Sequence, residues 1–273
     1  MQRLIYFLVI TIVLFNCDSE EEKSLENHSI KVIAHRGMHN KYSENTIGAI
    51  DAAIEHNLDY VEIDVRTTKD GYLVLMHDGT VDRTTNGSGR VSHLSLEQIQ
   101  SVVVKGNDGA GVTEERVPLL SEALRCMSGK IGAYVDIKDA EAKAVLDALT
   151  FFDMLEYSVI YSNETQLHKI KEIDPEARIM PEVDSEEDLN RVMSNLKPKI
   201  VAMSWHGFSE QLVAKIHNSN MKVFLDVLGL GDNPDGVRRA IAAGVDGIQS
   251  DNPEMVLQVI TNELKQISQE TQR

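Results

Sequence analysis

Short stretches rich in β-branched residues alternate with helical patterns along most of the chain. Eight such stretches predict strands at residues 31–37, 60–68, 132–138, 158–162, 177–183, 199–205, 222–228 and 245–251. Between most of them, apolar residues recur every three or four positions, as Ile47, Ile50 and Ile54 do, which is typical of amphipathic helices. These helices are predicted at 44–57, 139–152, 164–173, 185–195, 209–218, 235–243 and 253–268.

Strand–helix alternation implies right-handed crossovers and a parallel sheet. Eight such units in about 240 residues predict a (β/α)8 TIM barrel. A doubly wound open sheet is the structural alternative, but it usually needs fewer strands. No glycine-rich dinucleotide motif follows the first predicted strand, which also favours the barrel.

One long interval interrupts the alternation, between the second and third predicted strands. Residues 71–78 have the pattern of a strand that folds back, with Asp70-Gly71 as its turn. Residues 79–117 are then rich in Gly, Ser, Thr and Asn, with one short helix near 95–102, and a helix at 119–127 resumes the barrel. Because long loops on a rigid scaffold commonly carry function, we expect a small insertion on the catalytic face after the second strand.

The N-terminal stretch has a different pattern from the rest of the chain. After a short basic start, an apolar run of twelve residues extends from Leu4 to Phe15. It is shorter than the roughly 20 residues that span a bilayer, and it is typical of a signal-peptide core. The sequence Leu-Phe-Asn-Cys that ends at Cys17 resembles a bacterial lipobox, although Phe15 and Asn16 are bulkier than the residues usual there.

We therefore expect residues 1–16 to be a lipoprotein signal peptide and Cys17 to carry the lipid. Residues 17–29, which include three consecutive glutamates, are expected to form an acidic tether before a barrel domain at 30–273. The protein is then lipid-anchored in the bacterial cell envelope, in the periplasm or on the outer-membrane surface. An ordinary secretory signal with an incidental cysteine is the alternative.

The net charge of −16 argues against nucleic acid or an anionic surface as a partner, so contact with a membrane is expected only through the lipid. An anionic substrate then requires positive charge at one place in the site. The sequence leaves the oligomeric state open.

Polar residues gather where the first predicted strands end, and barrel enzymes carry their sites at this end. They are His35, Arg36, Glu62, Asp64, His77, Asp78, Asp136 and Lys138. Glu62 and Asp64 lie two apart, so both side chains leave the same face of the strand. Two close carboxylates stay ionised only beside a cation, and three acids with oxygen donors suit Mg²⁺ or Ca²⁺. Structural ion pairs of Lys138 with Glu62 and Asp136 are the alternative.

Two histidines and two cations complete a plausible chemical set. Arg36 and Lys138, with a metal ion, would bind a phosphate group and stabilise charge on its oxygens. One histidine can then remove a proton from the attacking oxygen while the other protonates the leaving alkoxide. This division of labour suits a phosphodiester, whose alcohol leaves poorly unless it is protonated.

These residues lie in motifs that resemble the glycerophosphodiester phosphodiesterase family: "AHRG…SENT", "EIDVRTTKDGYLVLMHD", "DRTTNGSG", "DIK" and "GVDGIQSDNP", from about Val32 to Pro253. The resemblance implies a TIM barrel with an insertion after the second strand. It implies His35 and His77 as the acid–base pair, Arg36 and Lys138 as phosphate binders, Glu62 and Asp64 as metal ligands, and Glu44 and Asn45 as residues that support the first loop.

The chain departs from the family's pattern at two places. The family's third metal ligand is usually a glutamate two residues before the lysine, whereas this chain has Asp136. A Trp-Thr-Val-Asn run on the seventh strand of many relatives is replaced by "FLDVLG", which places Asp226 toward the substrate's alcohol. Trp205 is a second candidate for the pocket, with a core or rim position as its alternative. The other histidines are expected to be solvated: His28, His39, His56, His93, His168 and His217.

The sequence therefore predicts a metal-dependent phosphodiesterase that hydrolyses glycerophosphodiesters to glycerol 3-phosphate and an alcohol, with one Ca²⁺ or Mg²⁺ ion. One alternative is a phospholipase C-like or lysophospholipase D-like enzyme that acts on lipids. The other is a lipoprotein that binds phosphodiesters without catalysis. The head group, the metal and the attacking group, water or the glycerol 2-hydroxyl, stay open.

Overall fold

The computed structural model describes residues 30–106 and 115–271. The predicted signal peptide, Cys17 and the acidic tether lie outside these residues, as does 107–114 of the insertion. No helix within the described ranges is long and apolar enough to cross a membrane.

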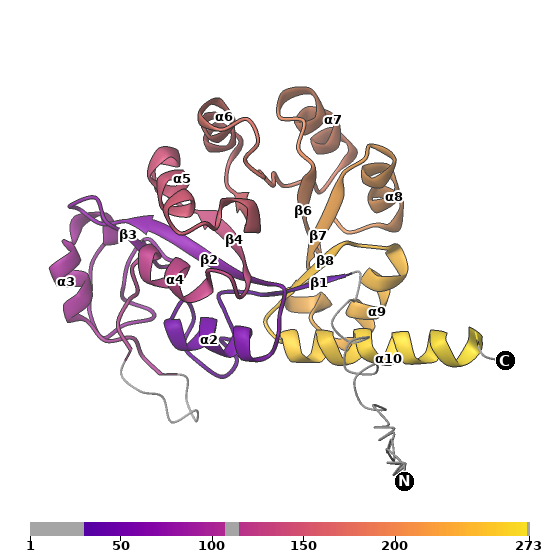
Figure 1. The fold of residues 1–273 in the computed structure, drawn as a ribbon, viewed down its shortest axis with the longest axis horizontal. Helices are drawn as coiled ribbons and strands as arrows, with labels where there is room; N and C mark the ends of the chain where they lie inside the picture. The colour runs from indigo at the N-terminus through magenta and orange to yellow at the C-terminus, as the bar shows by residue number, and fades with distance from the viewer. Residues whose placement is uncertain (1–29, 107–114, 272–273) are drawn as a thin grey trace, which may run out of the picture.

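Parallel strands form the wall of a nearly closed barrel, with helices around it (Figure 1). Their order across the described part of the sheet is β5-β4-β2-β1-β8-β7-β6. Their bounds are β1 (Lys31–Ala34), β2 (Tyr60–Thr67), β4 (Gly132–Ile137), β5 (Ser158–Tyr161), β6 (Ile200–Ser204), β7 (Lys222–Asp226) and β8 (Gly247–Ser250). β1 pairs with both β2 and β8, so the first and last strands of the described sheet are neighbours. Bridges from Ile179 to β5 and from Glu182 to β6 nearly close the sheet, which confirms the barrel prediction over the open sheet.

The predicted strand at 177–183 does not form a regular strand, and this is a correction. Its residues make isolated bridges to β5 on one side and β6 on the other. Met180 N donates to Ile160 O at 2.8 Å, and Ala202 N donates to Pro181 O at 2.9 Å. Pro181 has no N–H to donate, which interrupts a continuous ladder. The segment still closes most of the gap between β5 and β6.

Eight helices cover the outside of the described barrel (Figure 1). They are α2 (Ile47–Glu55), α4 (Leu120–Met127), α5 (Ala142–Phe151), α6 (Glu164–Ile173), α7 (Glu186–Asn195), α8 (Glu210–Asn218), α9 (Pro234–Ala243) and α10 (Pro253–Thr271). Side-chain caps set several of their starts: Thr46, Asn163, Ser185, Ser209 and Asn233 each accept a hydrogen bond from the first turn. The helices therefore begin within a few residues of their predicted positions.

The short strand β3 (Leu73–Leu75) precedes the insertion and pairs antiparallel with β2, as the fold-back pattern at 71–78 predicted. Gly71 takes a φ of 87° in the connecting turn, a conformation that favours glycine. The turn η1 (Val91–His93) and helix α3 (Leu96–Ser101) follow. A small apolar core of its own holds this part together, made of Val74, Met76, Val81, Val91, Ile99, Val104 and Val117.

A second apolar cluster fills the inside of the barrel: Ile33, Tyr134, Val159, Met180, Ile200, Ala202 and Phe224. The polar residues come after these positions in β1, β4 and β7. They therefore lie at the C-terminal ends of the strands, next to this apolar layer.

Candidate active site

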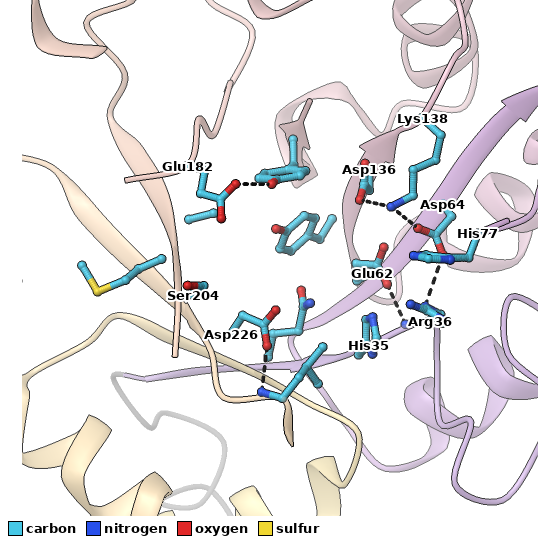
Figure 2. Close-up of a pocket in the computed structure, with 16 residues that line it drawn as sticks. His35, Arg36, Glu62, Asp64, His77, Asp136, Lys138, Glu182, Ser204 and Asp226 are labelled. Atoms are coloured by element: carbon cyan, nitrogen blue, oxygen red, sulfur yellow. Dashed lines mark hydrogen bonds and ion pairs between the residues drawn. The ribbon is translucent and has the colours of Figure 1, made fainter. Parts of the chain in front are cut away.

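A cavity of about 240 Å³ opens at the C-terminal ends of the strands (Figure 2). Its walls hold every predicted catalytic, phosphate-binding and metal-binding side chain. The lining residues are His35, Arg36, Glu62, Asp64, His77, Tyr134, Asp136, Lys138, Tyr161, Glu182, Ala202, Met203, Ser204, Asp226, Leu228 and Gln249. Residues from opposite ends of the sequence thus meet in one space.

Three carboxylates come together on β2 and β4. Asp64 and Asp136 are partners in the register of the two strands, and Glu62 lies two residues before Asp64. One oxygen of each of the three acids lies within 4.8 Å of the others. Burial raises the pKa of Glu62 well above its usual value, and the charges of Asp64 and Asp136 raise it further. Such a set of buried oxygen donors fits a hard divalent cation.

Lys138 faces the same acids. Its Nζ lies 2.6 Å from Asp136 Oδ2 and 3.0 Å from Asp64 Oδ1. Burial lowers the pKa of Lys138, but Asp64 and Asp136 outweigh this effect and raise it overall. The lysine therefore stays charged at the edge of the carboxylate cluster. The predicted ion pair with Asp136 is present, and the second partner is Asp64 rather than Glu62.

The backbone after β1 turns sharply at Arg36 and Gly37, whose φ angles are 53° and 80°. A side chain at Gly37 would place its Cβ 2.7 Å from Ala49 Cβ, so only glycine fits. This turn directs Arg36 N toward Glu62 Oε2 at 2.7 Å. The guanidinium Nη1 of Arg36 donates to Glu44 Oε1 at 3.0 Å, which holds the arginine over the cavity.

Asn45 supports a metal-ligand candidate directly, which is more than the loop support that the family resemblance implies. Its Nδ2 donates to Asp64 Oδ2 at 2.7 Å, and its Oδ1 accepts from Asp64 N at 3.1 Å. Asn45 is buried and takes a φ of 56°, a conformation in which asparagine is enriched. The side chain therefore fixes both the position and the orientation of the Asp64 carboxylate.

Each of the two histidines is held through Nδ1 by a carboxylate. His35 Nδ1 lies 2.6 Å from Asp251 Oδ1, and His77 Nδ1 lies 2.8 Å from Asp78 Oδ1. A carboxylate at Nδ1 keeps the proton there, so Nε2 is the atom left for proton exchange. Burial lowers the pKa of His35, against the hydrogen bond to Asp251, which raises it.

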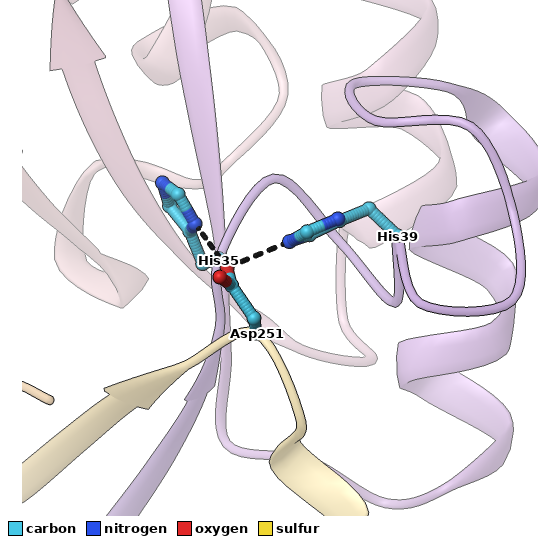
Figure 3. Close-up of side chains that lie close together, drawn as sticks. All are labelled: His35, His39 and Asp251. Atoms are coloured by element: carbon cyan, nitrogen blue, oxygen red, sulfur yellow. Dashed lines mark hydrogen bonds and ion pairs between the residues drawn. The ribbon is translucent and has the colours of Figure 1, made fainter. Parts of the chain in front are cut away.

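His39 is partly buried and contacts a carboxylate, whereas the sequence predicted a solvated side chain. Its Nε2 lies 2.7 Å from the same oxygen, Asp251 Oδ1, that His35 contacts (Figure 3). The two rings are edge-on, with centroids 5.6 Å apart. Sequence reasoning could not find this contact, because 212 residues separate the two partners.

Arg83 links the insertion to the loops that carry Asp78 and Glu44. Its Nε donates to Asp78 Oδ2 at 2.7 Å, and its Nη1 donates to Glu44 Oε2 at 2.7 Å. Asp78 contacts His77 and Glu44 contacts Arg36, so one guanidinium supports both neighbours. Asp78, Arg83 and Asp251 received no role from the sequence, although each lies within one of the motifs quoted above.

The opposite side of the cavity has a different character. Tyr161 Oη donates to Glu182 Oε2 at 2.8 Å, and Leu228 N donates to Asp226 Oδ1 at 2.8 Å. Burial raises the pKa of Asp226 to about 6. Asp226 is one of the residues that line the cavity. Figure 2 shows Glu182, Ser204 and Asp226 across the space from Lys138 and Asp64.

Trp205 is not among the residues that line the cavity. Its ring stacks on Phe208 with centroids 5.1 Å apart, and the Arg239 guanidinium lies 5.2 Å from its centroid. A Cβ at Gly231 would come within 2.4 Å of the indole, so the backbone packs closely against the ring. The side chain therefore takes the packing role that was the alternative for it.

Comparison with known proteins identifies the family. The model of the glycerophosphoryl diester phosphodiesterase family matches residues 35–255. The chain belongs to this family. A glycerophosphodiester phosphodiesterase from Caldanaerobacter subterraneus is 32% identical over 247 residues, which cover 84% of this chain and 97% of that protein. The resemblance seen in the motifs is thereby confirmed.

Solved structures agree with the observed barrel. A phosphodiesterase from Oleispira antarctica, in complex with the product sn-glycerol-3-phosphate, is 25% identical with a TM-score of 0.77 and covers 85% of this chain and 96% of that one. A glycerophosphodiester phosphodiesterase from Agrobacterium tumefaciens is 26% identical with a TM-score of 0.74, covering 84% of this chain and 99% of that one.

Proposed function

We propose that this protein hydrolyses glycerophosphodiesters to glycerol 3-phosphate and an alcohol. The observation that carries the proposal is the convergence of two carboxylate-braced histidines, three acids and two cations on one cavity. The family membership and the Oleispira relative with its bound product support the same reaction. Each part of this set has a separate task in the reaction.

Glu62, Asp64 and Asp136 would hold one divalent cation, Ca²⁺ or Mg²⁺. The set contains only oxygen donors, which these ions prefer, and the buried like charges need a cation for all three acids to stay ionised. When bound, the cation draws negative charge from the phosphate oxygens. Asp136 is one methylene shorter than the family's usual glutamate, but its register with Asp64 brings the two carboxylates together.

Arg36 and Lys138 bind the phosphate in this proposal. Both border the cavity beside the acids and carry fixed positive charge. Arg36 is preorganised by Glu44, and Lys138 by the two aspartates. Hydrogen bonds from these cations would strengthen as charge develops on the phosphate oxygens in the transition state.

His35 and His77 move the protons. With Nδ1 held by a carboxylate, Nε2 of one neutral histidine accepts the proton of the attacking oxygen. Nε2 of the other, when protonated, donates to the leaving alkoxide. A water molecule and the glycerol 2-hydroxyl both fit this scheme as the attacking group, and detection of a cyclic phosphate product would separate them.

The test measures glycerol 3-phosphate released from a panel of glycerophosphodiesters, with and without a chelator. We expect turnover with wild type that the chelator abolishes and Ca²⁺ or Mg²⁺ restores. His77→Ala should lose nearly all turnover while its circular dichroism and melting temperature stay close to wild type. Near-normal rates in His77→Ala, or full activity in chelator, would contradict the assignment. Turnover by itself excludes a binding protein without catalysis.

The described part of the insertion favours a soluble substrate over a lipid. Val91 and Ile99 are buried, and Leu94 and Leu96 pack against the same small core rather than forming an apolar rim. A lysophospholipase D-like enzyme would need such a rim for the acyl chain. Equal or higher rates on lysophosphatidylcholine than on glycerophosphocholine would favour the lipid alternative.

We also propose that the protein is anchored in the cell envelope through lipid on Cys17. The proposal rests on the apolar run and the lipobox-like sequence. Wild-type protein should incorporate labelled fatty acid and fractionate with membranes. Cys17→Ser should do neither. Soluble wild-type protein without label would support the ordinary secretory signal instead.

A further inference from the structure

A second group of metal-binding side chains lies beside the carboxylate cluster. It consists of His35, His39 and Asp251, which we call the His–Asp cluster (Figure 3). Its three ligand atoms, His35 Nδ1, His39 Nε2 and Asp251 Oδ1, lie within 4.8 Å of one another. Both histidine nitrogens point at the same carboxylate oxygen, at 2.6 and 2.7 Å. Two imidazoles and one carboxylate are a frequent ligand set for zinc.

We propose that the His–Asp cluster binds Zn²⁺ or a similar transition-metal ion, and that this ion inhibits the enzyme. The inhibition rests on the function proposed above, but the binding does not. Tetrahedral zinc, with bonds of about 2.0–2.1 Å, holds its ligand atoms roughly 3.3 Å apart. The distances from His35 Nδ1 and His39 Nε2 to Asp251 Oδ1 therefore need to lengthen by only about 0.6 Å for an ion to take the place of the two hydrogen bonds.

The surroundings of the cluster give an ion a way in. The side chains of His39 and Asp251 are 26% and 45% exposed, whereas His35 is 12% exposed and faces the catalytic cavity. His39 lines a neighbouring cavity together with Ser43 and Glu44. An ion can therefore arrive from the His39 side and take a water molecule as its fourth ligand, without passing through the substrate cavity.

The two metal-binding clusters differ in chemistry, so they select different ions. The cluster of Glu62, Asp64 and Asp136 offers only oxygen and suits Mg²⁺ or Ca²⁺. The His–Asp cluster offers two imidazole nitrogens, which Zn²⁺, Cu²⁺ and Ni²⁺ prefer over magnesium or calcium. A saturating concentration of Mg²⁺ should therefore fill the first and leave the second open to zinc.

Binding of the ion would inhibit through the tautomer of His35. In the metal-free protein Asp251 holds a proton on Nδ1, so Nε2 has the lone pair that proton exchange requires. An ion on Nδ1 places the proton of the neutral ring on Nε2 instead. The ring then cannot accept a proton from the attacking oxygen, and it cannot become an imidazolium that donates one while the ion stays bound.

His39→Gln is the variant that tests the site, because His39 contributes to the ion and not to the reacting atoms. His56→Gln is the matched control. His56 is 33% exposed, pairs with Glu254 and is not one of the three residues of the cluster. In saturating Mg²⁺ we expect Zn²⁺ to inhibit wild type and His56→Gln at the same concentration. His39→Gln should need at least about tenfold more, since each ligand contributes strongly to zinc affinity.

A readout that does not need turnover keeps the test independent of the proposed function. Co²⁺ in place of zinc should give the visible absorption of a four- or five-coordinate nitrogen site. The signal should persist in Glu62→Gln and disappear in His39→Gln. Equal zinc inhibition of His39→Gln and wild type, relief of inhibition by more Mg²⁺, or a Co²⁺ signal that follows Glu62 would each overturn the proposal. Absence of turnover with an intact Co²⁺ signal would contradict only the proposed function.

Discussion

Asp251→Asn tests whether the carboxylate that contacts His35 Nδ1 positions this histidine for catalysis. The change keeps the size of the side chain but removes its charge and one acceptor oxygen. Asp251 Oδ1 accepts hydrogen bonds from both His35 Nδ1 and His39 Nε2. Although burial raises the pKa of Asp251, the hydrogen bonds from the two histidines hold it well below its usual value. The residue is therefore ionised at every pH of a normal assay.

The expected effect is large because the variant disturbs both the tautomer and the basicity of His35. An amide that turns its NH₂ toward Nδ1 places the proton of the ring on Nε2. In the serine-protease triad the same Asp→Asn change lowers kcat by about 10⁴. His39 still contacts the side chain of residue 251. We therefore expect kcat to fall by about 10² to 10⁴, or roughly 2.7–5.4 kcal/mol.

The assay is the pH dependence of kcat/KM for release of glycerol 3-phosphate. The hydrogen bond to Asp251 raises the pKa of His35, whereas burial lowers it. Removal of the Asp251 charge should therefore lower the pKa of His35, and the part of the pH profile that reports this pKa should shift to lower pH. Asp246→Asn is the control, because Asp246 accepts from His217 Nε2 at 2.9 Å outside the cavity. A kcat within about threefold of wild type, with an unshifted profile, would refute a positioning role for Asp251.

Three further predictions follow from the site. Asn45→Ala removes two hydrogen bonds to Asp64 and leaves an alanine in a left-handed backbone conformation. The free energy of unfolding in urea should therefore fall by about 2–4 kcal/mol. Asn45→Gly should recover about 1 kcal/mol of this loss, because glycine adopts the left-handed conformation without strain. Because the pKa of Glu62 is raised in the folded state, the free energy of unfolding in chelator should fall as pH rises above 4.5, the ordinary value of a glutamate. Ca²⁺, Mg²⁺ or Glu62→Gln should flatten this slope, and a flat wild-type profile would count against it. Burial raises the pKa of Asp226 to about 6, so KM should rise as pH falls through that value in wild type but not in Asp226→Asn.

The strands and helices were largely predictable because their signals are local. The three-to-four-residue spacing of Ile47, Ile50 and Ile54 and the cap at Thr46 act within one turn or two. The segment at 177–183 was predicted as a strand from its apolar residues, but Pro181 has no N–H for a ladder. Its place in the barrel depends on what lies on either side of it.

The candidate site divides in the same way. Glu62 and Asp64 are on one face because the period of a strand is two, and the topology of a parallel barrel brings Asp136 beside them. The contacts of Asp251 with His35 and His39 could not be predicted from the sequence, because they depend on the pairing of β1 with β8.

By itself, the sequence determined the barrel and the family, and it predicted the three acids, the two cations and the two histidines of the site. These follow from local periodicity and from motifs short enough to lie on one strand or loop. Only the tertiary structure decided which carboxylate holds which histidine, that Asn45 fixes Asp64, and that Trp205 packs away from the cavity. Hydrogen bonds and packing act over a few ångströms, and separation along the chain does not determine which side chains come that close.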